Sequence, residues 1–211
     1  MKKKNDNIPN CKVTLLGDSG VGKSSIIARF VSGIFMKDSI STSGGSYSQK
    51  IYEKNGNKIR LNIWDTVGQE KFRALGKNFY KDAYIICIVY DITNKQSFNN
   101  VKEIWYPDVQ KYGEKFNIIS IIGNKCDKYE EEEVNEEDAK SFTNEIGAKF
   151  FLVSALNGNG ITNMFNALAN NYLNPEFEDK VRESFKNKNN SFKLKKKDFH
   201  AKKKNNKSNC C

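Results

Sequence analysis

Short, almost continuously apolar runs alternate along this chain with stretches of helical periodicity. The runs at residues 11–16, 84–90 and 118–122 predict strands, and the last two are apolar enough to be covered on both faces of a sheet. Two β-rich runs, at residues 47–54 and 58–65, are separated by Asn-Gly-Asn, which predicts a hairpin turn. Strand and helix signals therefore alternate through most of the sequence.

Helical periodicity marks four stretches, and another short strand is predicted at residues 149–153. The predicted helices cover residues 24–31, 96–112, 136–146 and 160–172. Pro107 is expected to end or kink the second helix, because proline lacks an N–H, and Pro175 is expected to stop the last. The pattern predicts an α/β fold: an open, mostly parallel six-stranded sheet with one antiparallel hairpin strand, flanked on both faces by about five helices.

The composition changes near residue 176, where Lys, Asn and Ser replace large apolar side chains. Such a segment buries too little apolar surface to offset its ordering entropy. We therefore expect residues 1–10 to be a flexible basic N-terminus, residues 11–175 to be one domain and residues 176–211 to be a disordered tail. Residues 180–211 hold 12 of the 35 Lys/Arg and two of the 25 Asp/Glu, so the local excess of +10 in this stretch equals the net charge of the whole chain. A basic nucleic-acid-binding domain is not expected.

Several other classes of protein are not expected. The longest apolar run, residues 84–90, is too short to cross a bilayer, the N-terminal lysines lead into no signal segment, and Lys2 stands where N-myristoylation needs glycine. His200 is the only histidine and the five cysteines lack regular spacing, which argues against zinc sites, His-based triads and a disulfide framework. We expect an intracellular protein with Cys11 and Cys87 as apolar filler.

Residues 17–24 match the pattern G-x-x-x-x-G-K-[ST] between a predicted strand and a predicted helix. The glycines let the backbone turn tightly so that N–H groups converge on phosphate oxygens, and the helix N-terminus adds its dipole. Lys23 would neutralise the β- and γ-phosphates, and the Ser24 hydroxyl would ligate Mg²⁺. This motif predicts a nucleoside triphosphate site and leaves ATP and GTP open.

A second motif, Asn124-Lys125-Cys126-Asp127, follows the strand at residues 118–122, at the carboxyl end where open α/β sheets bind ligands. The Asp127 carboxylate can accept from N1–H and the 2-amino group of guanine. Adenine offers neither donor and would leave the carboxylate unpaired, at a cost of about 1–3 kcal/mol or more. Lys125 can lie along the ring face, and Asn124 can tie this loop to the phosphate loop. Together the two motifs predict a guanine nucleotide site.

With these motifs, residues 11–174 resemble the Ras superfamily, which implies the P-loop small-GTPase fold and a bound Mg²⁺. Residues 65–70, Asp-Thr-Val-Gly-Gln-Glu, are similar to the family's D-T-A-G-Q-E element. The likeness implies that Asp65 holds Mg²⁺ through water, that the Gly68 N–H meets the γ-phosphate and that Gln69 orients the attacking water. Thr42 resembles the threonine that joins Mg²⁺ only in the triphosphate state.

The resemblance extends to the base pocket. Phe35 matches an aromatic ring that the family places against the base, and residues 154–156 resemble the S-A-K loop, whose alanine N–H contacts the guanine carbonyl. The catalytic candidates are therefore Gln69 and Lys23, and the Mg²⁺ candidates are Ser24, Thr42 and Asp65. The candidates for GTP binding are Ser19, Gly20, Val21, Gly22, Lys23, Ser24, Ser25, Phe35, Thr42, Gly68, Asn124, Lys125, Asp127, Ser154, Ala155 and Leu156.

Within the superfamily the chain resembles the Rab proteins best, and its sequence at residues 44–47 and 74–76 is most similar to that of their endosomal branch. The likeness implies that Tyr47, Trp64 and Phe79 form an exposed aromatic cluster facing effectors; three buried core rings are the alternative. Three departures stand out. Val67 replaces an alanine and can slow switching or hydrolysis. Leu156 replaces a lysine that packs by the base. Residues 43–47 replace the family's usual T-I-G-V-D-F sequence.

The last two residues, Cys210 and Cys211, resemble the Rab signal for two geranylgeranyl groups. Two lipid chains anchor a protein stably, and the lysines before them would add attraction to an anionic leaflet. As a coil, residues 176–209 would span roughly 30–35 Å, enough for the domain to face the cytosol while tethered.

The main hypothesis is a monomeric, Rab-like GTP/GDP switch that hydrolyses GTP slowly and regulates vesicle trafficking. The resemblance implies an exchange factor, a GTPase-activating protein, a GDP-dissociation inhibitor, an escort protein and effectors as partners. It also implies a place on the cytoplasmic face of intracellular membranes, endosomal or other, with cycling through the cytosol. The alternatives are an effector-binding module that barely hydrolyses GTP, a non-Rab member of the superfamily, a nucleic-acid binder that uses the tail and a P-loop kinase.

Overall fold

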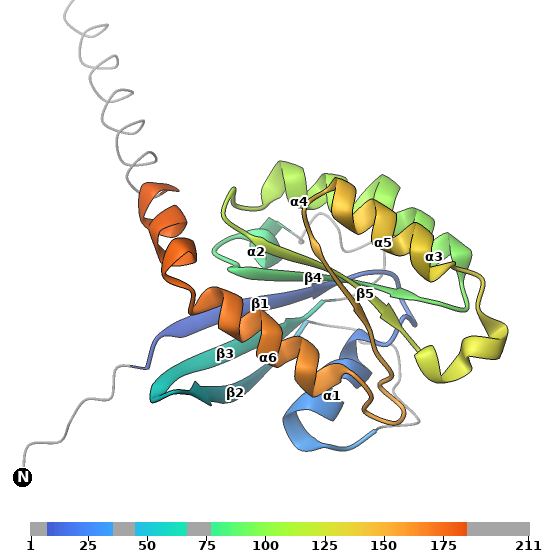
Figure 1. Ribbon diagram of the computed structural model, residues 1–211, viewed down its shortest axis with the longest axis horizontal. Helices are drawn as coiled ribbons and strands as arrows, with labels where there is room; N and C mark the ends of the chain where they lie inside the picture. Colours follow the sequence, from blue (N-terminus) through green and yellow to red (C-terminus); the bar gives the residue numbers. More distant parts are fainter. Residues whose placement is uncertain (1–7, 36–44, 67–76, 185–211) are drawn as a thin grey trace, which may run out of the picture. The chain divides into compact units, whose positions relative to one another are not determined.

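Six strands form one sheet in the order β2-β3-β1-β4-β5-β6 (Figure 1). The computed structural model describes residues 8–35, 45–66 and 77–184 of the 211-residue chain. β2 runs antiparallel to β3, and the other neighbours are parallel. The strands are β1 (Asn10–Leu16), β2 (Ser46–Lys54), β3 (Asn57–Asp65), β4 (Ile85–Asp91), β5 (Ile118–Asn124) and β6 (Lys149–Leu152). The predicted sheet is confirmed.

The burial of each strand follows its place in the sheet. All seven residues of β4 are buried, because helices cover both of its faces and strands flank both of its edges. Along β3 buried residues alternate with half-buried ones, whereas β2, at the edge, exposes most of its side chains. The apolar run that predicted β4 thus reflects burial on both faces.

The hairpin between β2 and β3 closes through two residues. Lys54 pairs with Asn57, and Asn55 and Gly56 between them have positive φ angles of 51° and 78°. A two-residue hairpin whose twist matches its strands needs this conformation at both central positions, which Asn and Gly adopt readily. The turn is one residue shorter than predicted, since Asn57 already belongs to β3.

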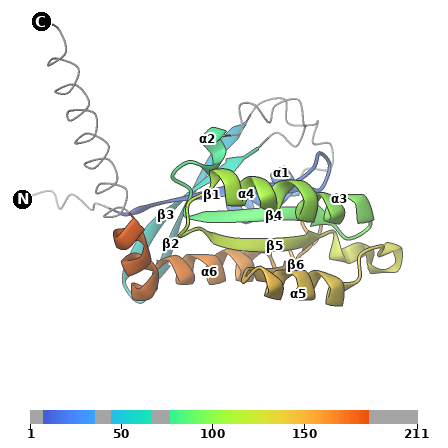
Figure 2. The ribbon, with the colours of Figure 1, turned by 90° about the horizontal axis from the view of Figure 1, so that it is seen from above.

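Helices lie on both sides of the sheet (Figure 1 and Figure 2). On one side, α1 (Lys23–Ser32) contacts α6 (Ile161–Tyr172), and the rings of Phe30 and Phe165 stack at 3.8 Å between centroids. The other side carries α3 (Lys95–Asn100), α4 (Tyr106–Tyr112) and α5 (Glu136–Glu145). The sequence analysis missed two short elements, α2 (Lys77–Tyr80) and a 3-10 helix, η3 (Cys126–Glu131).

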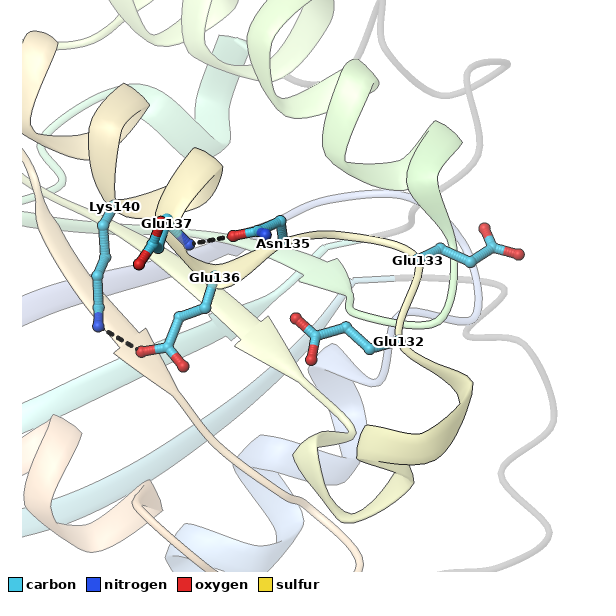
Figure 3. Close-up of a pocket in the computed structure, with 6 residues that line it drawn as sticks. All are labelled: Glu132, Glu133, Asn135, Glu136, Glu137 and Lys140. Carbon is cyan, nitrogen blue, oxygen red and sulfur yellow. Dashed lines mark hydrogen bonds and ion pairs between the residues drawn. The ribbon is translucent and has the colours of Figure 1, made fainter.

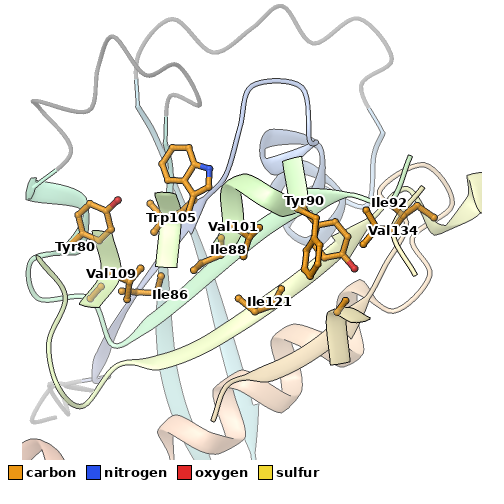
Figure 4. Packing of buried hydrophobic residues seen from close by; sticks show 14 residues of the cluster. Tyr80, Ile86, Ile88, Tyr90, Ile92, Val101, Trp105, Val109, Ile121 and Val134 are labelled. Atoms are coloured by element: carbon orange, nitrogen blue, oxygen red, sulfur yellow. The ribbon is translucent and has the colours of Figure 1, made fainter. Parts of the chain in front are cut away.

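An apolar cluster lies between β4 and the helices that follow it. Ile86, Ile88 and Tyr90 of β4 belong to it together with Val101 and Trp105 (Figure 4). All five side chains are at most 6% exposed, and together they fix the segment after β4 against the sheet. This packing sets where that segment meets the loop after β1.

The helix predicted over residues 96–112 is divided into three segments. Between α3 and α4 the chain makes a π turn, η2 (Val101–Trp105), in which the Tyr106 N–H bonds the Val101 carbonyl five residues back. Pro107 follows in the first turn of α4, where the missing N–H is tolerated. The chain therefore accommodates this proline by widening one turn rather than by ending the helix.

A second unit, Leu173–Cys211, follows the first, Met1–Tyr172. The sequence predicts disorder from residue 176, but residues 175–184 are helical. Asn174 caps this helix by accepting from the Glu176 N–H at 3.1 Å, and Pro175 takes the first helical position. Pro175 thus begins a helix, which corrects the expectation for residues 176–184; residues 185–211 lie outside the described residues.

Two further expectations concern cysteines and membranes. Cys11 and Cys87 are buried in β1 and β4, and burial raises the pKa of both thiols, to about 12 for Cys87, as suits apolar filler. Across residues 8–35, 45–66 and 77–184 no helix has both the length and the apolar character to cross a bilayer.

Candidate functional site

The phosphate loop, residues 17–24, connects β1 to α1, and two of its glycines are required by close contacts. Gly17 has φ +136°, and a Cβ there would lie 2.2 Å from the Val89 carbonyl oxygen. Gly22 has φ +95°, and a Cβ there would lie 2.3 Å from Asn124 Nδ2. Neither position has room for a side chain, so the glycine pattern reflects backbone packed against β4 and β5.

Lys23 folds back over this loop. Its side chain is 6% exposed, and Nζ donates to the carbonyl oxygens of Gly17 at 2.9 Å and Asp18 at 2.7 Å. Burial lowers the pKa of Lys23 to about 8, while the nearby carboxylates of Asp65 and Asp18 act in the opposite direction. The loop therefore holds a cation at its centre, suited to neutralise phosphate charge.

Two of the predicted Mg²⁺ ligands meet at the end of the loop. Ser24 Oγ donates to Asp65 Oδ2 at 2.5 Å, and Asp65 is buried at the end of β3. A hydroxyl and a carboxylate beside a phosphate site suit Mg²⁺, which usually takes few protein oxygens and completes its shell with water and substrate phosphates. Within the described part of the chain no group of three or more His, Cys, Asp or Glu could hold a metal.

Asn124, the last residue of β5, joins the phosphate loop to the loop after β6. It is 1% exposed; its Nδ2 donates to the Val21 carbonyl at 2.8 Å, and its Oδ1 accepts from the Ala155 N–H at 3.1 Å. Both ends of one buried amide are thus used to hold two loops together. The predicted tie between the base motif and the phosphate loop is present.

The other two polar residues of this motif are also held in place. Lys125 has a positive φ of 67°, and its Nζ pairs with Asp91 Oδ2 at 2.5 Å. Asp127 Oδ1 accepts from the hydroxyl of Ser154, which is fully buried. The carboxylate proposed to read guanine is therefore oriented by the serine of the following loop, whereas Leu156 in that loop is 51% exposed.

Arg29, near the end of α1, was missed by the sequence analysis. Its guanidinium donates to the carbonyls of Ala155 at 3.0 Å, Gly33 at 2.8 Å and Leu156, and it lies 6.0 Å from the ring centroid of Phe35. The arginine thus links the predicted aromatic neighbour of the base to the loop after β6. The sequence carried no signal for this link, since the two segments are more than a hundred residues apart.

The three aromatic residues expected to face effectors are all accessible in part. Tyr47 is 48% exposed and meets half-buried Trp64 edge-on, with centroids 5.3 Å apart. Phe79 is half-buried. A Cβ on Gly45, two residues before Tyr47, would lie 3.1 Å from the Phe79 ring. Lys12 Nζ lies 5.3 Å from the Trp64 ring centroid. None of the three rings is buried, so three core rings do not describe this cluster.

Several predicted positions fall outside the described residues. These are Thr42, Val67, Gly68, Gln69, Cys210 and Cys211. Of the remaining GTP-binding candidates, Ser19 and Gly20 are exposed at the turn of the phosphate loop and Ser25 is half-buried in the first turn of α1. The structure thus brings together the phosphate, base and part of the Mg²⁺ candidates.

An acidic pocket of about 600 Å³ lies apart from these loops, at the start of α5 (Figure 3). Its lining residues are Glu132, Glu133, Asn135, Glu136, Glu137 and Lys140. Asn135 caps the helix by accepting from the Glu137 N–H at 2.7 Å, and Lys140 pairs with Glu136 at 2.6 Å. Carboxylates are favoured at a helix N-terminus, and they repel phosphate. Helix capping explains this pocket.

Comparisons with known proteins agree with this geometry. A model of the Ras family matches residues 12–174. Ras-related protein Rab-26 of Rattus norvegicus is 40% identical over 159 residues, which are 75% of this chain and 62% of that protein. Ras-related protein RABD2c of Arabidopsis thaliana is 39% identical over 157 residues, covering 74% of this chain and 77% of that protein. Ras-related protein RIC1 of Oryza sativa subsp. japonica is 38% identical over 163 residues, which cover 77% of this chain and 80% of that protein.

The chain thus spans somewhat less than two thirds of the length of Rab-26 and more than three quarters of the two plant relatives. The family match includes the phosphate loop, the Asn124 motif and the loop after β6. Sequence similarity and the convergence of these loops at one edge of the sheet lead to the same assignment: the chain belongs to the Ras family and is related to its Rab proteins.

Proposed function

We propose that this protein is a Rab-like molecular switch that binds GTP and GDP and hydrolyses GTP. The observation that carries the proposal is the position of Asn124, whose single side chain bonds both Val21 of the phosphate loop and Ala155 of the loop after β6. Phosphate and base sites joined in this way suit one guanine nucleotide lying across both.

Base selection rests on Asp127. Its carboxylate would accept from N1–H and the 2-amino group of guanine, and the bond from Ser154 supports its orientation. Lys125, Phe35 and the Ala155 N–H would complete the pocket around the ring. Adenine would leave Asp127 without its two donors, so ATP should bind far more weakly than GTP.

Hydrolysis would proceed by attack of water on the γ-phosphorus while its bond to the β–γ bridging oxygen breaks, so that GDP leaves and inorganic phosphate forms. Lys23 and the N–H groups of the phosphate loop would stabilise charge on the transferred group, and Gln69 would orient the water. Ser24, Thr42 and Asp65 would hold Mg²⁺, which would supply positive charge to the phosphates, and the Ser24–Asp65 contact fits that role.

Acceleration is expected from a GTPase-activating protein. The chain has four arginines, Arg29, Arg60, Arg73 and Arg182. Arg29 is bound to carbonyls of the loop after β6, Arg60 bonds Asn10, and Arg182 pairs with Glu178 in the second unit. None of these three is a candidate for an arginine that reaches the γ-phosphate from within the chain. The intrinsic hydrolysis rate should therefore be low and should rise about 10³–10⁵-fold when an activating protein supplies an arginine.

The membrane-related part of the proposal rests on the tail and on the family. Geranylgeranyl groups on Cys210 and Cys211, with the upstream lysines, would hold the protein on the cytoplasmic face of intracellular membranes. An escort protein and a GDP-dissociation inhibitor would deliver and extract it, and effectors would bind at Tyr47, Trp64 and Phe79. Regulation of vesicle trafficking is the function proposed. The similarity of residues 74–76 to the endosomal branch of Rabs favours an endocytic step.

Calorimetry of the nucleotide-free protein with GDP, GTP and ATP tests the base assignment. Asp127→Asn should lower GTP affinity about a hundredfold or more and favour xanthosine triphosphate, because an amide donates where the carboxylate accepts. Asp138→Asn, an exposed change in α5, is the matched control. Equal affinities for ATP and GTP, or an Asp127→Asn variant that binds GTP normally, would refute the proposal.

A second candidate is a nucleotide-dependent effector-binding module that barely hydrolyses GTP, which Val67 favours because it replaces the usual alanine. Single-turnover GTPase assays with and without an activating protein separate the two. Stimulated hydrolysis that is lost in Gln69→Leu supports the enzyme. No stimulation by any activating protein, with tight GTP binding, supports the module.

A further inference from the structure

The carboxylate of Asp18 lies in the phosphate loop but is bound from the other side of the fold. Its Oδ1 accepts from Trp105 Nε1 at 2.8 Å, and its Oδ2 accepts from Asn100 Nδ2 at 2.7 Å. These donors are 87 and 82 residues away along the chain. Both oxygens of one loop side chain are therefore held, one by the last residue of α3 and one by the last residue of the π turn that follows.

The π turn explains how the two donors reach one carboxylate. In an α-helix, residues five apart point about 140° away from each other around the axis. A π turn extends its hydrogen bond over five residues instead of four, so Trp105, its last residue, is rotated back toward the side of Asn100, the residue that precedes it. The wider turn thus has a consequence at the nucleotide site, because a regular α-helix would direct these two side chains apart.

Both donors are themselves fixed. Trp105 is 6% exposed within the apolar cluster on β4 (Figure 4). The Asn100 amide is oriented by Gln96, whose Nε2 donates to Asn100 Oδ1 at 2.9 Å and so leaves Nδ2 directed at Asp18. The carboxylate is therefore bound by donors that are already in position.

The main chain of the same residue contacts the phosphate-binding lysine. The Asp18 carbonyl accepts from Lys23 Nζ at 2.7 Å, beside the Gly17 carbonyl at 2.9 Å. A restraint on the Asp18 side chain is thus a restraint on the peptides that position Lys23 and that present N–H groups to phosphate. Hydrogen bonds to an ionised carboxylate are among the stronger ones in proteins.

We propose that Asn100 and Trp105 are positioning residues for the phosphate loop and that they act on it through the Asp18 carboxylate. Neither touches the nucleotide; they hold the loop in its binding conformation, so that less ordering is required when the β-phosphate binds. This inference rests on the proposed function, since it takes a guanine nucleotide as the ligand of the loop.

The test compares release of fluorescent GDP with binding of GMP, which lacks the β-phosphate. Trp105→Phe keeps an aromatic ring and removes the N–H, and Asn100→Ala removes the second donor from a half-buried position. Each should raise the GDP dissociation rate about five- to fiftyfold and leave GMP affinity within twofold. Tyr106→Phe and Asn99→Ala, changes at the neighbouring positions, are the matched controls.

A double-mutant cycle with Asp18→Ala separates positioning from general loosening. Asp18→Ala alone should match the combined loss of both donors, and Trp105→Phe should add nothing further in that background. Additive effects, equal losses of GDP and GMP, or unchanged GDP release in both Trp105→Phe and Asn100→Ala would overturn the inference. If Trp105→Phe does not fold, Asn100→Ala carries the same cycle. A wild-type chain that binds no guanine nucleotide refutes the proposed function instead.

Discussion

The phosphate loop and the base-reading loops are built to hold their ligands in different ways. In the phosphate loop Gly17 and Gly22 pack directly against residues of β4 and β5, and the backbone itself would contact phosphate. At the ends of β5 and β6, buried side chains make the connections: Asn124 bonds backbone of Val21 and Ala155, and Ser154 bonds the Asp127 carboxylate. Substitutions in the first region should therefore act through backbone geometry and folding, and those in the second through individual hydrogen bonds.

The largest effect should come from adding one methyl group to the phosphate loop. Gly17→Ala would place a Cβ 2.2 Å from the Val89 carbonyl oxygen, in a residue with φ +136°. The free energy of unfolding should fall by about 2–5 kcal/mol through strain and overpacking. Urea unfolding without nucleotide measures it. Gly33→Ala, with φ +72° and open space around it, is the control and should cost about 1 kcal/mol. Equal losses in the two variants would contradict the role of packing.

Asn124→Ala should weaken both regions at once. The change leaves the Val21 carbonyl and the Ala155 N–H without their buried partner, so GDP affinity should fall about ten- to hundredfold. Competition binding should show a parallel loss for GMP, unlike the selective loss expected for Trp105→Phe. Asn159→Ala, an exposed amide in the loop after β6, is the control. If GMP binding is unaffected, Asn124 braces the phosphate loop alone.

The charge of Lys23 should make nucleotide affinity depend on pH. Burial lowers the pKa of Lys23 in the free protein to about 8, and bound phosphate favours the protonated form and raises it again. Affinity is therefore full below pH 8 and falls as the pH rises above it, by up to about tenfold per pH unit. Calorimetry from pH 7 to 9 measures the slope. In Lys23→Arg the slope should be much smaller, because arginine stays charged; an identical slope would assign the effect to another group.

The smallest of these effects should come from Arg29. Arg29→Lys keeps the charge but loses the planar fork that bonds Ala155, Gly33 and Leu156, so GDP release should quicken about two- to fivefold. Arg60→Lys, in β3, is the control. Stopped-flow release measures both, and an effect as large as that of Asn124→Ala would show that this loop depends on Arg29 more than on the buried amide.

The sequence was sufficient where local chemistry decides the structure. The apolar runs located β4 and β5 because both strands are covered on two faces, and Asn55-Gly56 located the hairpin because few residues adopt its φ angles. Gly17 and Gly22 were predicted to allow close backbone approach, and both are packed against neighbouring strands. A signal was also overlooked, since Asn174-Pro175 is typical of a helix start.

Long-range side-chain partners were not predictable in the same way. Asp18 occupies one of the positions of the phosphate motif at which any residue is allowed. Its bonds to Asn100 and Trp105 depend on a π turn that no local sequence pattern predicts. Nothing in the sequence around Arg29 indicates its bonds to the loop after β6. Such contacts depend on how distant segments meet after the sheet has formed, and one sequence contains no measure of that.

The two faces of the edge strand β2 differ in their contacts and in their exposure to solvent. Its half-buried residues include Lys50, which donates to the Phe30 carbonyl in α1, and Tyr52, whose hydroxyl donates to Asn170 in α6 at 2.8 Å. These inward ties pin the strand to the helices beneath it. The intervening positions, among them Tyr47 and Ile51, point outward and are about half exposed. Substitutions in the outward row would therefore leave the contacts to α1 and α6 intact, whereas substitutions in the inward row would remove them.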